Sequence, residues 1–116
     1  MTVPLPRLVD SHCHLPLLER PLADVLRDAE ANGIEHVLCV SVDMETYPAV
    51  RQVAVDFRQV SASVGVHPNS EMGPLEPCVE QLVALANDPL IVAIGETGLD
   101  YYRQSGDLAW QHDRFR

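Results

Sequence analysis

Short apolar runs alternate with longer amphipathic runs along the chain, and this alternation limits the folds that it can adopt. The apolar runs predict buried strands at residues 8–12, 34–41, 60–66 and 90–95. The longer runs have apolar side chains at helical spacing and predict helices at residues 21–32, 47–57, 75–87 and 107–116. Strands that alternate with helices over short connections pair in parallel, through right-handed crossovers. Four such units fit either half of a (β/α)8 barrel or a small open doubly wound sheet.

Composition indicates one small globular domain, because 47% of the 116 residues are hydrophobic and 22% are charged. The net charge is −9, and all eight basic residues are arginine. Such a surface repels nucleic acid unless bound cations reverse the local sign. Two divalent ions would add four positive charges at a binding site, so the acidic balance does not exclude a phosphate substrate.

Cysteine usage and the N-terminus bear on the compartment. The three cysteines are far apart in the sequence and include no CxxC pair, which argues against a disulfide framework and favours a reducing compartment. The N-terminus lacks the pattern of a signal peptide, and no apolar stretch has the length of a membrane span. We therefore expect a cytoplasmic protein with no membrane contact.

The segment DSHCH at residues 10–14 is the strongest local signal for chemistry. Alternate residues of a strand point to the same side, so His12 and His14 project together and can share one metal ion. Asp10 lies on the same side and is positioned to orient a histidine ring nitrogen. The alternative interpretation is a pair of polar residues that cap a strand.

Two further segments place polar side chains at predicted strand ends. Glu96 directly follows the run LIVAIG, and a carboxylate at this point can bridge two metal ions. The alternative is a glycine-rich turn with an exposed acid. His67 follows the third predicted strand and precedes a proline. It is either structural or a contact for a phosphate or a metal-bound water.

Three segments together resemble the successive signatures of the TatD family of metal-dependent hydrolases. They are DSHCHL at residues 10–15, GVHP at 65–68 and GETGLDYY at 95–102. The resemblance implies a TIM barrel with two divalent ions, Mg, Mn or Zn, at the carboxyl ends of its strands. It implies that His12 and His14 hold one ion, that Glu96 bridges or completes the site, and that His67 lies near the substrate phosphate. The implied activity is phosphodiester hydrolysis, with DNA as the notable substrate.

The family pattern continues into further strands that supply two more histidines and an aspartate. We therefore expect residues 1–116 to form one partial-barrel domain, the N-terminal half of a (β/α)8 metallohydrolase, truncated at its C-terminus. The general base is expected outside this chain, and the isolated chain is expected to be inactive. Two alternatives stay open: an amidohydrolase, which also begins with HxH on its first strand, and a non-catalytic fragment that binds a metal or a partner.

Overall fold

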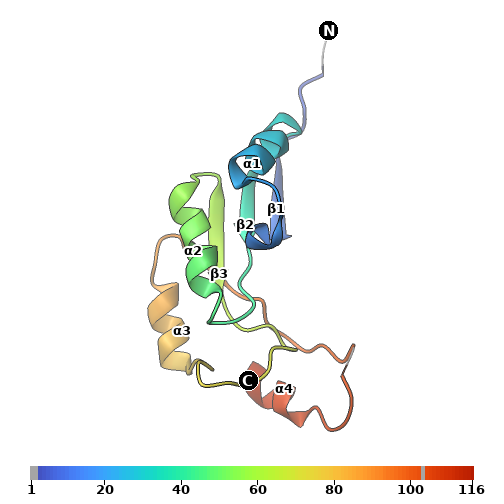
Figure 1. The fold of residues 1–116 in the computed structure, drawn as a ribbon, viewed down its shortest axis with the longest axis vertical. Coiled ribbons are helices and arrows are strands. Elements are labelled where there is room, and N and C mark those ends of the chain that lie inside the picture. The colour runs from blue at the N-terminus through green and yellow to red at the C-terminus, as the bar shows by residue number, and fades with distance from the viewer. Residues whose placement is uncertain (1–2, 103) are drawn as a thin grey trace.

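Four parallel strands form one sheet in the order β1-β2-β3-β4, in a computed structural model that describes residues 3–102 and 104–116 (Figure 1). The strands are β1 (Leu8–Cys13), β2 (Ile34–Cys39), β3 (Val60–Val64) and β4 (Ile91–Ile94). The helices are α1 (Leu22–Ala31), α2 (Tyr47–Asp56), α3 (Val79–Ala86) and α4 (Ala109–Phe115), with a short 3-10 helix η1 (Leu15–Leu17). Each strand pairs with its successor in the chain, as in a barrel, so the expected half-barrel fold class is confirmed.

The core lies between the middle strands and the helices that cover one face of the sheet. Strand β3 is the most buried: Val60, Ala62 and Val64 lie beneath α2 and its inward-facing Val50 and Val53. Burying each valine or leucine side chain contributes about 1.5–3 kcal/mol. These branched side chains explain both the strand and its central place, because they pack well on a pleated surface.

The sheet is open, and the molecule is elongated, with extents of 58 × 29 × 25 Å. Apolar side chains are exposed along the two outer strands, among them Val9 on β1 and Val92 and Ile94 on β4. No helix in the described part of the chain has both the length and the hydropathy that a membrane span needs.

Helix α3 begins later than its apolar pattern predicts. We expected a helix from residue 75, whereas the structure begins it at Val79, with Cys78 in an extended conformation at the N-cap. Pro77 explains the difference, because proline disfavours a helical conformation of the residue before it. The Gln81 side chain caps the N-terminus of the helix at this point, because its Oε1 accepts a hydrogen bond from the backbone N–H of Cys78 at 2.9 Å.

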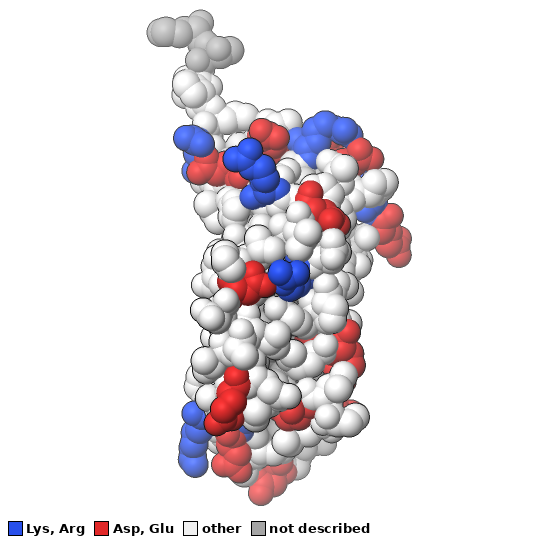
Figure 2. All heavy atoms as spheres, turned by 90° about the vertical axis from the view of Figure 1, so that its left-hand side faces the viewer, with Lys and Arg blue, Asp and Glu red and all other residues white. Residues whose placement is uncertain are grey.

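Figure 2 shows the helix-covered side of the molecule, where charged residues of both signs are interspersed. Fewer charged residues lie across the middle of this side. This side offers nucleic acid no continuous basic surface in the part of the chain that the structure describes. A phosphate ligand would therefore depend on local donors or on bound cations.

Candidate metal centre

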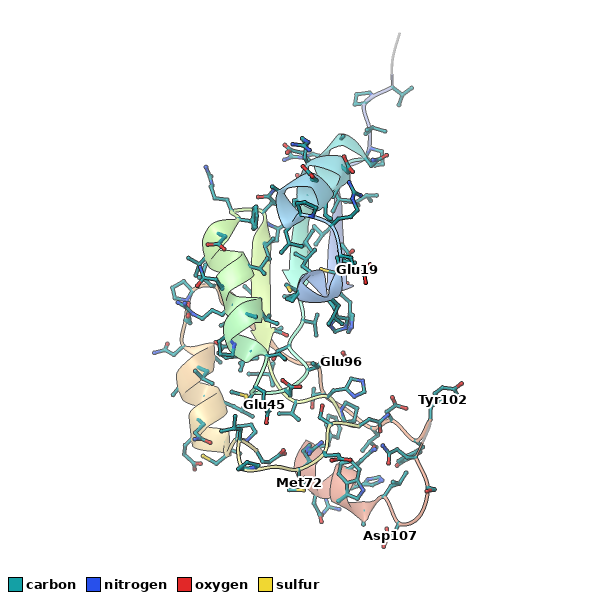
Figure 3. All side chains as sticks on the ribbon, viewed as in Figure 1. Glu19, Glu45, Met72, Glu96, Tyr102 and Asp107 are labelled. Atoms are coloured by element: carbon teal, nitrogen blue, oxygen red, sulfur yellow. The ribbon has the colours of Figure 1, made fainter. Side chains whose placement is uncertain are left out.

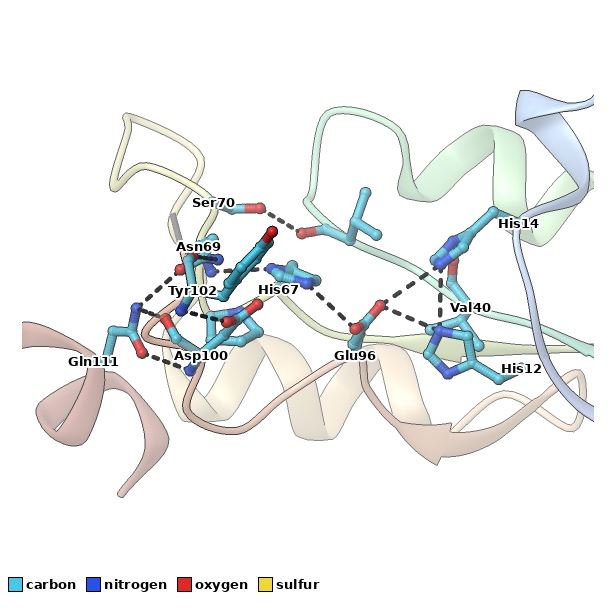
Figure 4. Close-up of polar contacts among 12 residues, drawn as sticks. His12, His14, Val40, His67, Asn69, Ser70, Glu96, Asp100, Tyr102 and Gln111 are labelled. Atoms are coloured by element: carbon cyan, nitrogen blue, oxygen red, sulfur yellow. Dashed lines mark hydrogen bonds and ion pairs between the residues drawn. The ribbon is translucent and has the colours of Figure 1, made fainter. Parts of the chain in front are cut away.

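Three predicted ligands meet at the carboxyl ends of the strands. His12 lies on β1, His14 directly follows that strand, and Glu96 follows β4. Their ligand atoms all lie within 4.8 Å of one another. Glu96 lies between the strands and α4 in Figure 3 and reaches toward both imidazoles in Figure 4. The sequence prediction that these side chains lie together agrees with this placement.

The spacing of the three atoms fits one divalent ion. The two Nε2 atoms are 3.3 Å apart. Glu96 Oε2 lies 3.4 Å from His12 Nε2 and 3.6 Å from His14 Nε2. Ligand atoms about 2.1 Å from a tetrahedral ion stand about 3.4 Å apart. Two imidazole nitrogens and a carboxylate oxygen are also a donor set that first-row transition metals and zinc prefer.

The main chain fixes how His14 presents its ring. The Nδ1 atom lies 3.2 Å from the carbonyl oxygen of Val40. A carbonyl only accepts hydrogen bonds, so Nδ1 carries the proton and the neutral ring turns its Nε2 lone pair toward His12 and Glu96. Such a contact orients an imidazole for metal binding.

His67 is held in the opposite tautomer. Its Nδ1 atom accepts a hydrogen bond from the backbone N–H of Asn69 at 3.0 Å, so the proton of the neutral ring lies on Nε2. That Nε2 lies 3.3 Å from Oε1 of Glu96, the carboxylate oxygen that faces away from the histidine pair. In this tautomer the neutral His67 offers a hydrogen-bond donor at the centre, beside the three candidate ligands.

Asp10 contacts the main chain of the histidine pair. Its Oδ1 accepts a hydrogen bond from the backbone N–H of His12 at 3.1 Å. The contact stabilises the end of β1, where both imidazoles emerge. Its predicted role toward a ring nitrogen stays a prediction.

The main chain before Glu96 passes very close to β3. The Gly95 N–H donates to the Val64 carbonyl at 3.0 Å. A Cβ on Gly65 would lie 2.7 Å from the carbonyl carbon and oxygen of Gly95. Real Cβ atoms essentially never approach that closely, so this approach of the two strand ends requires glycine at position 65.

Comparison with known proteins shows the family of the chain. A family model described as TatD related DNase matches residues 9–116. The chain belongs to the TatD family. YcfH of Escherichia coli strain K12, named an uncharacterized metal-dependent hydrolase, is 40% identical over 113 residues, or 93% of this chain and 42% of YcfH. A Mycobacterium tuberculosis protein named uncharacterized metal-dependent hydrolase TatD is 34% identical over 99 residues, or 82% of this chain and 38% of that protein.

A solved structure supports the TatD fold. The crystal structure of YjjV, a TatD homologue from Escherichia coli K12, superposes with a TM-score of 0.63 at 24% identity. The superposition covers 93% of this chain and 44% of YjjV. The chain therefore spans less than half the length of these relatives, in agreement with four of the eight strands of a barrel.

Gln111 on α4 is a site residue of this TatD chain whose role the sequence does not reveal. Its side chain is only 1% exposed. The Nε2 amide donates to Asn69 Oδ1 at 3.0 Å and to the Asp100 carbonyl at 2.8 Å, while Oε1 accepts from the Asp100 N–H at 2.8 Å. Gln111 thereby joins the loop of His67 to the loop that follows Glu96 (Figure 4).

Arg114 on α4 holds the same His67 loop from one helical turn away. Its Nη1 donates to the carbonyls of Ser70 at 2.7 Å, His67 at 3.2 Å and Pro68 at 3.4 Å. Its Nε and Nη2 pair with the Glu76 carboxylate at 2.7 and 3.1 Å. In the sequence, the only signal for a shared partner is the spacing of three residues, which places 111 and 114 on the same face of a helix. Without their partners, both residues are indistinguishable from surface polar residues.

Proposed function

We propose that this chain supplies the N-terminal part of the divalent-metal centre of a TatD-type hydrolase that cleaves phosphodiester bonds, with DNA as substrate. The observation that carries the proposal is the convergence of His12, His14 and Glu96, at the mutual spacing of ligands around one ion. The names of YcfH and the Mycobacterium tuberculosis relative support metal-dependent hydrolysis. The family description supports a nuclease.

The donor set favours manganese or zinc over magnesium for the ion at this triad. Magnesium prefers an all-oxygen octahedral shell, whereas imidazole suits transition metals and zinc. We propose a second ion as well, which Glu96 would help to hold. Its further ligands would come from beyond the triad, which is the one group of candidate ligands among the described residues.

The chain's own residues would bind and orient the reactants. A bound divalent ion supplies Lewis acidity, which polarises a phosphoryl oxygen and lowers the pKa of water. The Val40 carbonyl holds the imidazole of His14, and Asp10 holds the main chain of His12. His67, whose Nε2 lies 3.3 Å from Oε1 of Glu96, would turn its Nε2–H to an anionic oxygen of a bound substrate. Glu96 is occupied as a ligand, so we assign the general base to residues outside this triad.

Cations also explain how an acidic chain would accept DNA. The net charge of −9 repels a polyanion at long range. Two divalent ions at the strand ends would reverse the sign where the phosphate binds. The separated cysteines fit a reducing compartment, and we propose the cytoplasm for this protein.

An assay on a completed barrel tests the proposed reaction. Residues 1–116 would be fused to the part of YcfH that this chain does not match. We expect Mn²⁺-dependent cleavage of DNA by the fusion and its loss on Glu96→Gln, with intact YcfH assayed alongside for comparison. Hydrolysis of a cyclic amide with DNA left intact would instead support an amidohydrolase and overturn the proposal.

A further inference from the structure

Ser63 on β3 is a buried polar residue that the proposed metal centre does not use directly. Its side chain is 1% exposed, and its hydroxyl makes two hydrogen bonds. Oγ donates to the Gly95 carbonyl at 2.7 Å and accepts from the backbone N–H of Ser41 at 3.0 Å. The two partners lie just beyond the ends of β2 and β4, the strands on either side of β3. The hydroxyl therefore joins the ends of these two strands.

A third hydrogen bond closes these contacts into a ring around one peptide unit. The Glu96 N–H donates to the Ser41 carbonyl at 2.7 Å. The peptide that joins Gly95 to Glu96 is therefore held at its carbonyl by the Ser63 hydroxyl and at its N–H by Ser41. Ser41 is itself fixed by its bond to Ser63 and is fully buried. Every polar group of this ring is paired.

We propose that Ser63 is a positioning residue for the metal-binding carboxylate of Glu96. The inference rests on the proposed function, since it takes Glu96 as a ligand. A fixed main chain favours ion binding by a carboxylate, because less conformational freedom is lost when the ion binds. Ser63 fixes the backbone one bond before Glu96 and touches neither the ion nor the substrate.

A purely structural role for Ser63 leads to a different expectation. A serine that only satisfies a buried amide would change stability on removal and leave metal affinity as it was. Ser61 is the matched control, because it lies on the same strand two residues earlier. Its hydroxyl bonds the His36 ring at 2.7 Å, outside the ring of contacts around Glu96. Ser61→Ala therefore removes the same chemical group without touching the peptide before Glu96.

The test measures Mn²⁺ affinity by electron paramagnetic resonance and, without metal, the exchange rate of the Glu96 amide proton by NMR. We expect Ser63→Ala to weaken Mn²⁺ binding by about 10- to 100-fold and to speed exchange of this proton. Ser61→Ala should change neither quantity. Ser63→Thr keeps the hydroxyl and should show the Mn²⁺ affinity and the Glu96 amide exchange rate of the wild type. If Ser63→Ala does not fold, Ser63→Cys replaces it, and the weaker thiol donor should weaken Mn²⁺ binding and speed this exchange to a smaller degree.

The outcomes separate this inference from the proposed function. Wild-type Mn²⁺ affinity in folded Ser63→Ala, or an equal loss in Ser61→Ala, would overturn the positioning role. A wild-type chain that binds no Mn²⁺ would contradict the proposed metal centre instead. The positioning role toward a metal ligand would fall with it, and the exchange rate of the Glu96 amide would then report only whether Ser63 fixes the backbone before Glu96.

Discussion

At the scale of single residues, the centre depends on which nitrogen of each histidine carries the proton. The Val40 carbonyl holds the proton of His14 on Nδ1, and the Asn69 amide holds that of His67 on Nε2. His14 therefore offers a lone pair and His67 offers a donor, although both rings face Glu96. The backbone contacts thus assign His14 to the proposed metal binding and His67 to hydrogen bonding.

Residue-level prediction succeeds where a local rule applies. Strand periodicity placed His12 and His14 side by side, and the run before Glu96 placed it at a strand end. The roles of Ser63 and Gln111 were not predictable, because their partners lie 11 to 42 residues away in the sequence. Their burial follows from tertiary packing and has no periodic signal.

Gly65→Ala tests the close approach that positions Glu96. The new Cβ would collide with the Gly95 backbone, and we expect a loss of about 1–3 kcal/mol in the free energy of unfolding. Mn²⁺ affinity should fall as well, because the backbone before Glu96 must move. Denaturant unfolding and metal titration measure the two effects. Gly73→Ala is the control, since nothing lies within 4 Å of its Cβ. Equal effects in both variants would refute the explanation.

At the scale of elements, α4 stabilises the loops beside the candidate centre through hydrogen bonds. Gln111 and Arg114 both reach the segment at residues 67–70. The predicted helix at residues 107–116 is confirmed in outline as Ala109–Phe115. Of the side chains on this helix, Gln111 is buried and Phe115 is 54% exposed. Three hydrogen bonds compensate the buried amide of Gln111.

Arg114→Ala should destabilise the chain through the His67 loop. The arginine is 11% exposed and holds three carbonyls and one carboxylate. Hydrogen bonds to charged groups are each worth about 1.5–3 kcal/mol, and removal leaves acceptors unpaired, so we expect a loss of about 2–3 kcal/mol. Arg116→Ala is the control, because Arg116 is 81% exposed and should change stability by less than about 0.5 kcal/mol. Denaturant unfolding compares the two, and equal losses would contradict this role of α4.

Asp88 joins α2 to the start of β4 and should make stability depend on pH. The Leu90 amide, then the Arg51 guanidinium, holds the pKa of the Asp88 carboxyl below its usual value. A depressed folded-state pKa adds stability above the unfolded-state pKa, and this stability is lost as the pH falls through the folded-state pKa. Asp88→Asn should therefore lower the Tm at neutral pH and not in strong acid. Thermal unfolding across pH measures the difference.

Asp113→Asn removes a carboxylate from an exposed, weakly paired position and serves as the control for Asp88. Its Tm should follow the wild-type curve closely. A Tm difference between wild type and Asp88→Asn that stays constant from neutral pH into strong acid would contradict the linkage.

At the scale of the whole molecule, four parallel strands bring the proposed ligands to one edge without closing a barrel. The alternation of the sequence predicted these strands and their parallel order, yet it left open whether they form half of a barrel or an open sheet. The YjjV superposition decided in favour of the barrel. Local periodicity cannot make that choice, because both folds share the same repeating unit.

The 116-residue chain should bind metal and yet cleave no DNA. Its described residues gather one triad of candidate ligands, and the only carboxylate in that triad is the proposed ligand Glu96. Incubation with supercoiled plasmid and Mn²⁺ measures DNA cleavage by the chain, with the YcfH fusion assayed alongside for comparison. Robust turnover by the purified chain would show that a base is present within residues 1–116.

The most direct test of the central claim is the Mn²⁺ stoichiometry of the chain, measured with and without the histidine pair. Mn²⁺ is the suitable probe because it binds thiols weakly and so avoids the three cysteines. We predict saturable binding at the triad by the wild type, and its loss in the folded His12→Ala/His14→Ala double variant. Equal Mn²⁺ binding by both proteins would contradict the assignment of His12, His14 and Glu96 as a metal centre.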